Sequence, residues 1–248
     1  MKKLSFLLLF IFIASVVFAQ TTTTNPIAPS TPKKVNKDKG DRLVLDIFSD
    51  FWQQKPAVDA KKFNPSANVM LFKDFPINKG PISFAVGLGI DAHNFNSNGV
   101  VDTLLGGRTV FVPLSARLND VDSTTRSYSK NKMTVAYLDL PIEFRFRTKN
   151  ETGKKFKFAL GFKAGVLINK HTKYKGNYVD QNTGSVKTDK IKNHDIQGLE
   201  SFRYGVSARV GYGMYNLMFF YSLTTLFEKD KGPQMFPVSV GISLTPFN

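Results

Sequence analysis

The feature that most constrains this chain is an alternation of apolar residues with small or polar ones that continues over long runs. In the run at residues 83–95, the even positions from Phe84 to Ala92 are all apolar, whereas Asp91 and His93 lie among the small or polar odd positions. Alternation with a period of two predicts a β-strand whose two faces lie in different surroundings. The pattern therefore predicts the all-β class.

Seven further runs complete a set of eight predicted strands. Four repeat the alternation clearly, at residues 134–147, 156–168, 202–212 and 236–245, and three repeat it less regularly, at residues 42–52, 66–75 and 217–227. A strand in a soluble protein usually has about 5–6 residues, whereas a tilted strand needs about 9–11 residues to cross a bilayer. Most of the regular runs have at least the length of about 9–11 residues that a membrane-crossing strand needs. No run of 18 consecutive apolar residues follows residue 19, so no transmembrane helix is expected.

The face opposite the apolar one carries ionisable side chains in the middle of the strands. These are the acids Asp46, Asp50, Asp91, Asp139 and Glu143 and the bases Arg145, Arg147, Lys157, Lys163, Arg203 and Arg209. A soluble β-sandwich, the main alternative, would more often place Thr, Ser and Lys on its outer surface. Glycines and charges of both signs suit the crowded polar lumen of a small barrel. The sequence therefore predicts an eight-stranded antiparallel transmembrane β-barrel in a bacterial outer membrane.

These charges have two interpretations. One is an ion path or a catalytic cleft, and the other is a packed network of salt bridges. Eight strands leave an interior only wide enough for side chains, and buried charges must be paired. Five acids that face six bases nearly neutralise one another, so the packed network is favoured.

The predicted connections alternate between short and long. Those at residues 76–82, 148–155 and 213–216 are short turns, whereas those at 96–133 and 170–201 are long. Outer-membrane barrels have short periplasmic turns and longer extracellular loops, and an even strand number places both chain ends in the periplasm. A weaker alternation at residues 100–118 leaves ten strands as the alternative. An extracellular extension within the third connection is preferred for this segment.

The first 41 residues predict export and not a folded segment. Two lysines precede an apolar run at residues 4–17, and small residues follow it, so residues 1–19 are interpreted as a signal peptide. Residues 20–41 are rich in Thr, Pro and Lys and are expected to form a disordered periplasmic tail. Residues 42–248 then form the barrel.

The net charge of +15 points to an acidic partner. Removal of the signal peptide takes away two lysines and leaves +13. The lysines lie mostly in turns and in the tail and not along one helix face, so no nucleic-acid partner is expected. The expected partners are outer-membrane lipids and lipopolysaccharide, whose phosphates attract basic side chains, together with envelope or secretion-machinery proteins.

The two long connections are the expected contact surface for these partners. Their basic residues include Arg108, Arg117, Arg126, Lys187, Lys190 and Lys192. No cofactor is expected, and the absence of cysteine from the sequence excludes a disulfide framework and a thiolate metal site. His171 and His194 lie in the second long connection without metal-ligand spacing.

Five segments carry a family resemblance. They are YLDLPIEFRFR at residues 137–147, SFAVGLGI at 83–90, ALGFKAG at 159–165, YSLTTLFEKDKGP at 221–233 and FPVSVGISL at 236–244. In these segments the chain resembles the PorT-like outer-membrane β-barrel proteins of Bacteroidota. The resemblance covers about residues 42–248 and implies a barrel. The namesake of that family belongs to a secretion machinery, and the barrel motifs alone do not carry this role over.

The leading functional hypothesis is a non-enzymatic structural or accessory subunit of an envelope or secretion assembly. A lipid-modifying outer-membrane enzyme is one alternative, because Asp91 and His93 lie two residues apart near the extracellular end of their strand. Such a site needs a nucleophilic serine within hydrogen-bond reach of His93, and no serine motif marks one. A small pore is the other alternative.

Aromatic residues near the strand ends are expected to form girdles at the two bilayer interfaces. They are Trp52, Tyr137, Tyr204, Tyr212, Tyr215, Tyr221 and Phe236. A ligand-stacking surface is the alternative interpretation of this set.

Overall fold

The structure is a computed structural model that describes most of the chain after residue 41. The described residues are 42–53, 58–78, 80–104, 108–114, 127–148, 155–179 and 183–246. The predicted signal peptide at 1–19 and the predicted tail at 20–41 lie outside these ranges, as do Arg117 and Arg126. Among the described residues, no helix has the length and apolar character needed to cross a membrane.

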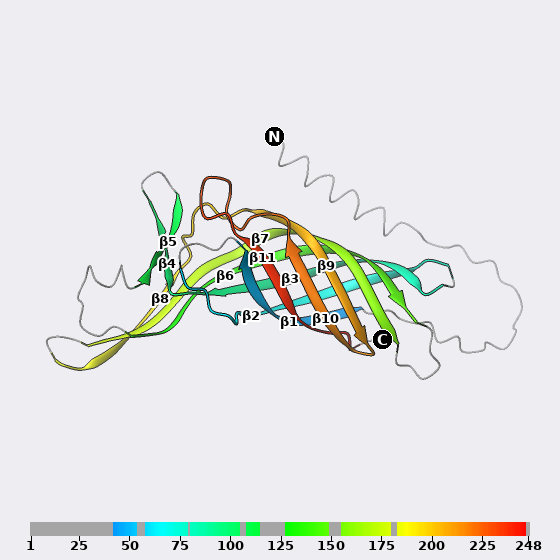
Figure 1. Cartoon of the computed structure of the whole chain (residues 1–248), viewed down its shortest axis with the longest axis horizontal. Coiled ribbons are helices and arrows are strands. Elements are labelled where there is room, and N and C mark those ends of the chain that lie inside the picture. The colour runs from blue at the N-terminus through cyan, green and yellow to red at the C-terminus, as the bar shows by residue number, and fades with distance from the viewer. Residues whose placement is uncertain are drawn as a thin grey trace, which may run out of the picture. The chain divides into compact units, whose positions relative to one another are not determined.

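The described residues contain eleven strands (Figure 1). They are β1 (Leu43–Gln53), β2 (Pro65–Pro76), β3 (Ile82–Asn96), β4 (Gly99–Thr103), β5 (Thr109–Pro113), β6 (Ser127–Arg147), β7 (Phe156–Val179), β8 (Val186–Asn193), β9 (Phe202–Tyr212), β10 (Tyr215–Ser222) and β11 (Phe236–Leu244). The eight alternating runs identified in the sequence correspond to β1, β2, β3, β6, β7, β9, β10 and β11.

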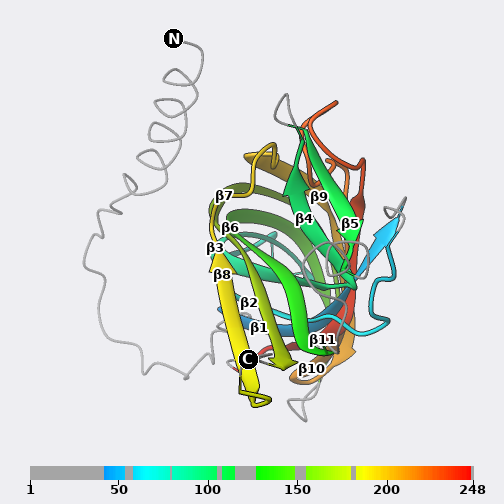
Figure 2. The same cartoon turned by 90° about the vertical axis from the view of Figure 1, so that its left-hand side faces the viewer.

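Eight of the strands form a closed antiparallel ring in the order β6-β3-β2-β1-β11-β10-β9-β7, which the pairing of β6 with β7 closes. Figure 2 looks into this ring from the end where β8 and the β4–β5 hairpin lie. Because every ring strand has two neighbours, the barrel has no open sheet edge along its wall. The predicted eight-stranded barrel is confirmed.

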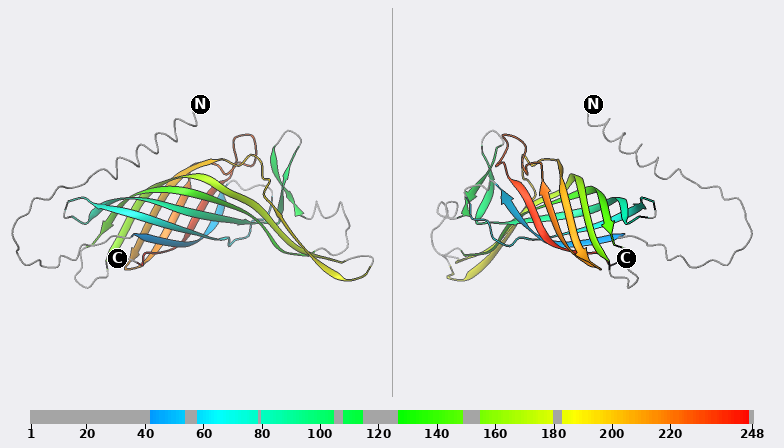
Figure 3. Two further views of the ribbon diagram at one scale, coloured as in Figure 1. Left: turned by 180° about the vertical axis from the view of Figure 1, so that it is seen from behind. Right: turned by 45° about the vertical axis from the view of Figure 1, so that its right-hand side comes forward.

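Three strands lie outside the ring. β4 and β5 pair only with each other, so the described part of the segment at 100–118 adds no strand to the wall and the ten-stranded alternative is wrong. β8 pairs with the far end of β7, from Thr172 to Val179. β6, β7 and β8 thus continue beyond the ring as a three-stranded sheet (Figure 3).

Two predicted boundaries differ from the structure. The connection at 170–201 was expected to be a loop, yet β7 extends to Val179 and β8 returns beside it. Both faces of this hairpin carry polar side chains, and Tyr174 and Ile191 are too isolated to form an apolar alternation that would reveal it. The strand predicted at 217–227 ends at Ser222, because Leu226 and Phe227 turn inward and are buried.

The two faces of the wall differ as the alternation predicts. Large apolar side chains on the outer face are strongly exposed, including Ile47 at 64%, Leu160 at 55% and Leu217 at 64%. Such a wide apolar surface would be unstable in water but suits contact with lipid acyl chains. The opposite positions along the same strands point into the barrel and are mostly buried polar or charged groups.

An apolar cluster covers one end of the lumen. It is built from strand ends and from the connections on the side of the long loops, and its buried members are Val58, Phe95, Phe111, Met133, Val135, Tyr137, Ile196, Leu199, Leu226, Phe227 and Met235. By the length rule for connections, this is the extracellular end. The core of the protein therefore has a charged body and an apolar cap.

Candidate functional site

The half of the lumen next to the apolar cap contains an ionic cluster centred on Arg203 on β9. Its Nη2 atom lies 2.7 Å from Asp91 Oδ2 and 2.6 Å from Asp139 Oδ2. Lys163 on β7 donates to the same Asp91 oxygen at 3.0 Å. All four side chains are buried and come from the four neighbouring strands β3, β6, β7 and β9, so this cluster joins one side of the barrel wall.

His93 continues this cluster towards the extracellular side. Its Nδ1 atom lies 3.0 Å from Asp50, and its Nε2 atom contacts Arg203 and lies 3.2 Å from Asp91 Oδ1. Ser66 and Ser239 donate their hydroxyls to Asp50, each at 2.6 Å. The hydroxyls at this site are thus directed at the aspartate and not at the histidine, and the arrangement does not form a serine–histidine nucleophile pair.

The half of the lumen next to the short turns contains a second ionic cluster. Glu143 accepts from Arg145 Nε at 2.8 Å and is also paired with Arg209. Asp74, which the sequence analysis did not select, accepts from Arg145 at 3.3 Å and from Arg147 at 2.8 Å. Asp74 sits at an inward position of β2 near the periplasmic turn, so the alternation could have identified it.

The remaining predicted lumen residues lie in or between these clusters. Lys157 donates to Thr245 at 3.1 Å, and Asp46 is buried between strands without an ion pair within the described residues. With Asp74, the described lumen holds six acids and six Lys and Arg side chains, namely Asp46, Asp50, Asp74, Asp91, Asp139 and Glu143 with Arg145, Arg147, Lys157, Lys163, Arg203 and Arg209. The interior is therefore close to electrically neutral.

Aromatic rings complete the packing of the cations. The guanidinium of Arg203 lies 4.1 Å from the centre of the Tyr137 ring, and that of Arg145 lies 4.2 Å from the Phe72 ring. Lys163 Nζ lies 4.3 Å from the centre of Phe220. A cation over an aromatic face is stabilised further when it is desolvated. The apolar inward residues of the less regular strands are thus partners of the charges.

The lumen has little room for a solute. The pocket beside His93 and Arg203 has a volume of about 10 Å³, and the pocket beside Arg145 and Lys157 near the other end is equally small. On this measure a single water molecule needs about 10–15 Å³, so each pocket has room for about one water. The described side chains therefore fill the barrel, as an eight-stranded wall leads one to expect.

Some aromatic residues are not where the sequence analysis expected them. Tyr137 is 3% exposed and packs inside the lumen, and Trp52 packs against Phe95 and Phe111 in the apolar cap. The girdle assignment is wrong for these two. Tyr137 lies on the inward register of β6, and Trp52 follows the outermost lumen charge of β1. Exposed tyrosines do remain on the outer face, namely Tyr204, Tyr212 and Tyr215.

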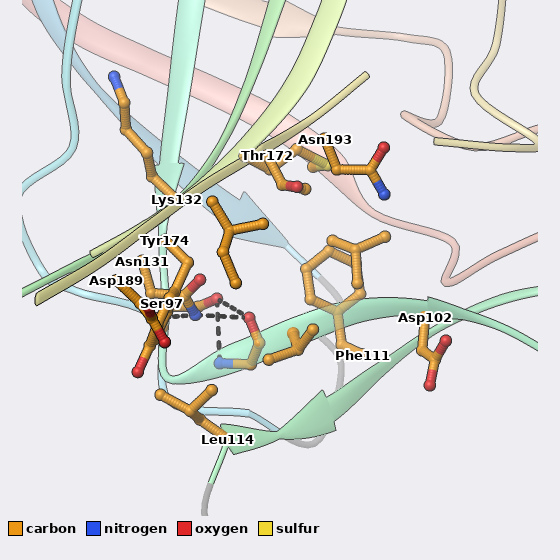
Figure 4. Close-up of a pocket in the computed structure, with 15 residues that line it drawn as sticks. Ser97, Asp102, Phe111, Leu114, Asn131, Lys132, Thr172, Tyr174, Asp189 and Asn193 are labelled. Atoms are coloured by element: carbon orange, nitrogen blue, oxygen red, sulfur yellow. Dashed lines mark hydrogen bonds between the residues drawn. The ribbon is translucent and has the colours of Figure 1, made fainter. Parts of the chain in front are cut away.

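A much larger pocket lies outside the ring, between the β4–β5 hairpin and the projecting sheet (Figure 4). Its volume is about 410 Å³. The hairpin contributes Val101 and Phe111, and the sheet contributes Met133, Tyr174 and Ile191. Pockets of about 300–1,000 Å³ with a mainly apolar lining and a few polar groups are typical ligand or side-chain sites.

Asn131 on β6 links the two walls of this pocket through hydrogen bonds. Its Nδ2 atom donates to the backbone oxygens of Ser97 at 3.0 Å and Gly99 at 2.8 Å. Ser97 Oγ in turn accepts from the Gly99 amide at 3.3 Å. These bonds hold the start of β4 against the projecting sheet. No group of His, Asp and Glu side chains within the described ranges could hold a metal ion.

A comparison with protein families agrees with this architecture. A family model described as outer membrane protein beta-barrel domain matches residues 47–228. Neither the curated proteins nor the solved structures provide a significant match to the chain.

Proposed function

The chain belongs to the outer membrane protein β-barrel domain family, and from this premise we propose that it is a non-enzymatic structural or accessory subunit of an envelope or secretion assembly. The observation that carries the proposal is the division of the molecule into a filled barrel and a projecting part with an open pocket of about 410 Å³. The barrel anchors the protein, and the projecting part contacts a partner.

The filled lumen argues against a pore. Its ionic clusters join several strands, and the apolar cap lies above them. An ion would have to replace buried salt bridges and then pass the cap, and removing a buried charge from its partners is costly. The charge network is therefore proposed to hold the barrel rigid.

The lumen also gives little support to an enzyme. Both ring nitrogens of His93 face charged groups, and the hydroxyls of Ser66 and Ser239 are donated to Asp50. A serine nucleophile needs a base that accepts its proton. A lipid hydrolase would have to use residues other than this group.

The projecting sheet has two features that suit a protein partner. The pocket presents Val101, Phe111 and Ile191 to an apolar side chain. Of the described strands, β8 pairs only with β7, so its second edge is open to strand addition. The chain resembles PorT-like barrels of Bacteroidota, but barrel motifs alone do not assign it to a secretion machinery, so the proposal rests on the pocket and on the second edge of β8.

Site-specific crosslinking in living cells tests this proposal. A photo-crosslinking amino acid at Ile191, which lines the pocket, should capture one envelope protein, and the same group at lipid-facing Leu160 should not. Val100→Trp, which fills the pocket, should abolish the product while the barrel stays folded. Lipid adducts alone at Ile191, or the same products at both positions, would remove the support for an accessory subunit.

A further inference from the structure

The projecting sheet carries two rows of lysines that no sequence pattern revealed. In one row Lys130 on β6 lies opposite Lys175 on β7, which lies opposite Lys190 on β8. In the other row the same three strands align Lys132, Lys173 and Lys192. Because the residues of each strand are two apart, all six side chains share one face of the sheet. We call this group the lysine lattice.

The lysine lattice lies on the side of the sheet that faces away from the pocket. The intervening residues Asn131, Tyr174 and Ile191 line the pocket, and the alternation along each strand directs the lysine side chains on either side of them the other way. Of the six lysines, Lys132 also borders the pocket. Figure 4 shows Lys132 with its side chain directed away from the other labelled residues of the pocket. Five of the six lysines are exposed, and Lys132 is half-buried.

Among the described residues of β6, β7 and β8, no acid shares the face of the lattice. Within the part of the chain that the structure describes, no carboxylate forms an ion pair with any of the six lysines. The only acid of β8, Asp189, lies on the pocket side. Lys132 donates instead to the amide oxygen of Asn94.

The electrostatic environment of the lattice is unfavourable to its own charges. Like charges directly opposite each other on neighbouring strands destabilise a sheet. Burial lowers the pKa of Lys132, and the neighbouring Lys130 and Lys173 lower it further. The pKa of His171, beside the lattice on β7, is lowered by burial and then by Lys192 and other cations around it. An anion bound across the rows would relieve this repulsion.

The position of the lattice indicates where that anion comes from. Its face continues the outer face of β6 and β7, where Leu138, Phe144 and Leu160 are exposed to lipid. Six residues separate Leu138 from Lys132, which is about 20 Å along a strand and about 14 Å of height at a tilt near 45°. The lysines therefore begin about 14 Å beyond the exposed Leu138, on the side of the long connections, where a headgroup larger than that of an ordinary phospholipid can reach them.

We propose that the lysine lattice binds the phosphorylated headgroup of an outer-leaflet glycolipid, of the lipopolysaccharide type. A headgroup with two phosphates can span the two rows, and the acyl chains can lie against the apolar face of the same strands. A protein partner would meet the same face only after displacing lipid. This inference is independent of the assembly role proposed above, because it uses the opposite side of the sheet.

The test measures binding of bisphosphorylated lipid A to the full-length protein in detergent. Replacing either row, with Lys130→Gln, Lys175→Gln and Lys190→Gln or with Lys132→Gln, Lys173→Gln and Lys192→Gln, should weaken binding by more than about tenfold, because each lysine beside an anionic surface contributes roughly a factor of five. The matched control removes three exposed lysines at the same end of the barrel, Lys61, Lys62 and Lys229, and should change the affinity by less than about twofold.

Further probes separate this site from general attraction to anions. Dephosphorylated lipid A, inorganic phosphate and phosphatidylglycerol micelles should bind at least about tenfold more weakly than bisphosphorylated lipid A. Replacing a row by arginine keeps the charge and should retain binding, which guards against a glutamine variant that fails to fold. Equal affinity of wild type and both glutamine variants, or equal binding of phosphatidylglycerol, would overturn the proposal.

Discussion

The molecule contains two groups of six basic side chains in opposite situations. In the lumen, six Lys and Arg side chains are buried among six acids and are mostly held by short contacts, such as the 2.6 Å contact between Arg203 and Asp139. In the projecting sheet, six lysines are mostly exposed and share a face without any described acid. The residue types are alike, so the difference lies in what surrounds them.

This difference assigns separate roles to the two groups. A buried charge that loses its partner is costly, so the lumen charges depend on one another and stabilise the closed barrel. An exposed lysine loses little when its neighbours change, because water solvates it. The lysine lattice is therefore available for an external anion, and the lumen network is not. The predictions below vary one group at a time.

The largest effect is expected from Arg203→Ala. This change leaves Asp91 and Asp139 buried without their main partner, and the free energy of unfolding should fall by about 3–5 kcal/mol. Urea unfolding in detergent, followed by tryptophan fluorescence, measures it. Combining Arg203→Met with Asp91→Asn and Asp139→Asn should restore part of the loss. A loss below about 1 kcal/mol for the single variant would mean that the cluster is not a buried one.

A smaller loss of unfolding free energy is expected from a substitution at Gly165, where the lumen charge network packs against the backbone. A methyl group at Gly165 would collide with the Asp139 carboxylate, so Gly165→Ala should lower the free energy of unfolding by about 1–3 kcal/mol. Gly80→Ala is a suitable control, because its added Cβ would come no closer than 3.5 Å to a neighbour. If both variants unfold at the same urea concentration, the lumen is looser at Asp139 than described.

Removing a charge from the lysine lattice should raise the stability of the folded protein, whereas removing one from the lumen lowers it. Lys173→Gln removes the one positive charge that lies directly opposite both Lys132 and Lys192, so stability should rise slightly, by about 0.2–0.5 kcal/mol. Hydrogen exchange of the β7 and β8 amides, measured without lipid, would detect this. A clear loss of protection on substitution would show that an unseen acid pairs with the lysine.

One effect of pH is expected at His171 in the projecting sheet. The pKa of His171 is lowered below its ordinary value of 6.5 by burial, Lys192, His194, Lys132 and Lys173. The unfolded segment therefore binds more protons than the folded one, so this contribution to stability is complete above pH 6.5 and is lost as the pH falls below it. NMR titration of the imidazole checks the direction, and bound lipid A should raise the pKa.

Much of the barrel could be predicted from the sequence, because a wall that contacts lipid on one side and charges on the other imposes a period of two. The strand from Phe202 to Tyr212 was placed with its exact ends. The lumen residues followed from the same parity, although Asp74 was missed.

The projecting part could not be predicted in this way. Residues 170–193 have polar side chains on both faces, so only pairing shows that they form a hairpin. The lysine lattice depends on the β6–β7 register, which joins residues more than 40 positions apart such as Lys132 and Lys173, and no local pattern encodes this register. The pocket and the apolar cap likewise join segments that are remote in the sequence.

The claim that the barrel is a closed scaffold is tested most directly by single-channel recording. The purified full-length protein, inserted in a planar bilayer and compared with a known porin, should give no steady conductance steps over a range of voltages. This result is expected because the lumen pockets beside Arg203 and beside Arg145 have volumes of only about 10 Å³. Steady steps of uniform size from the folded protein would contradict the account.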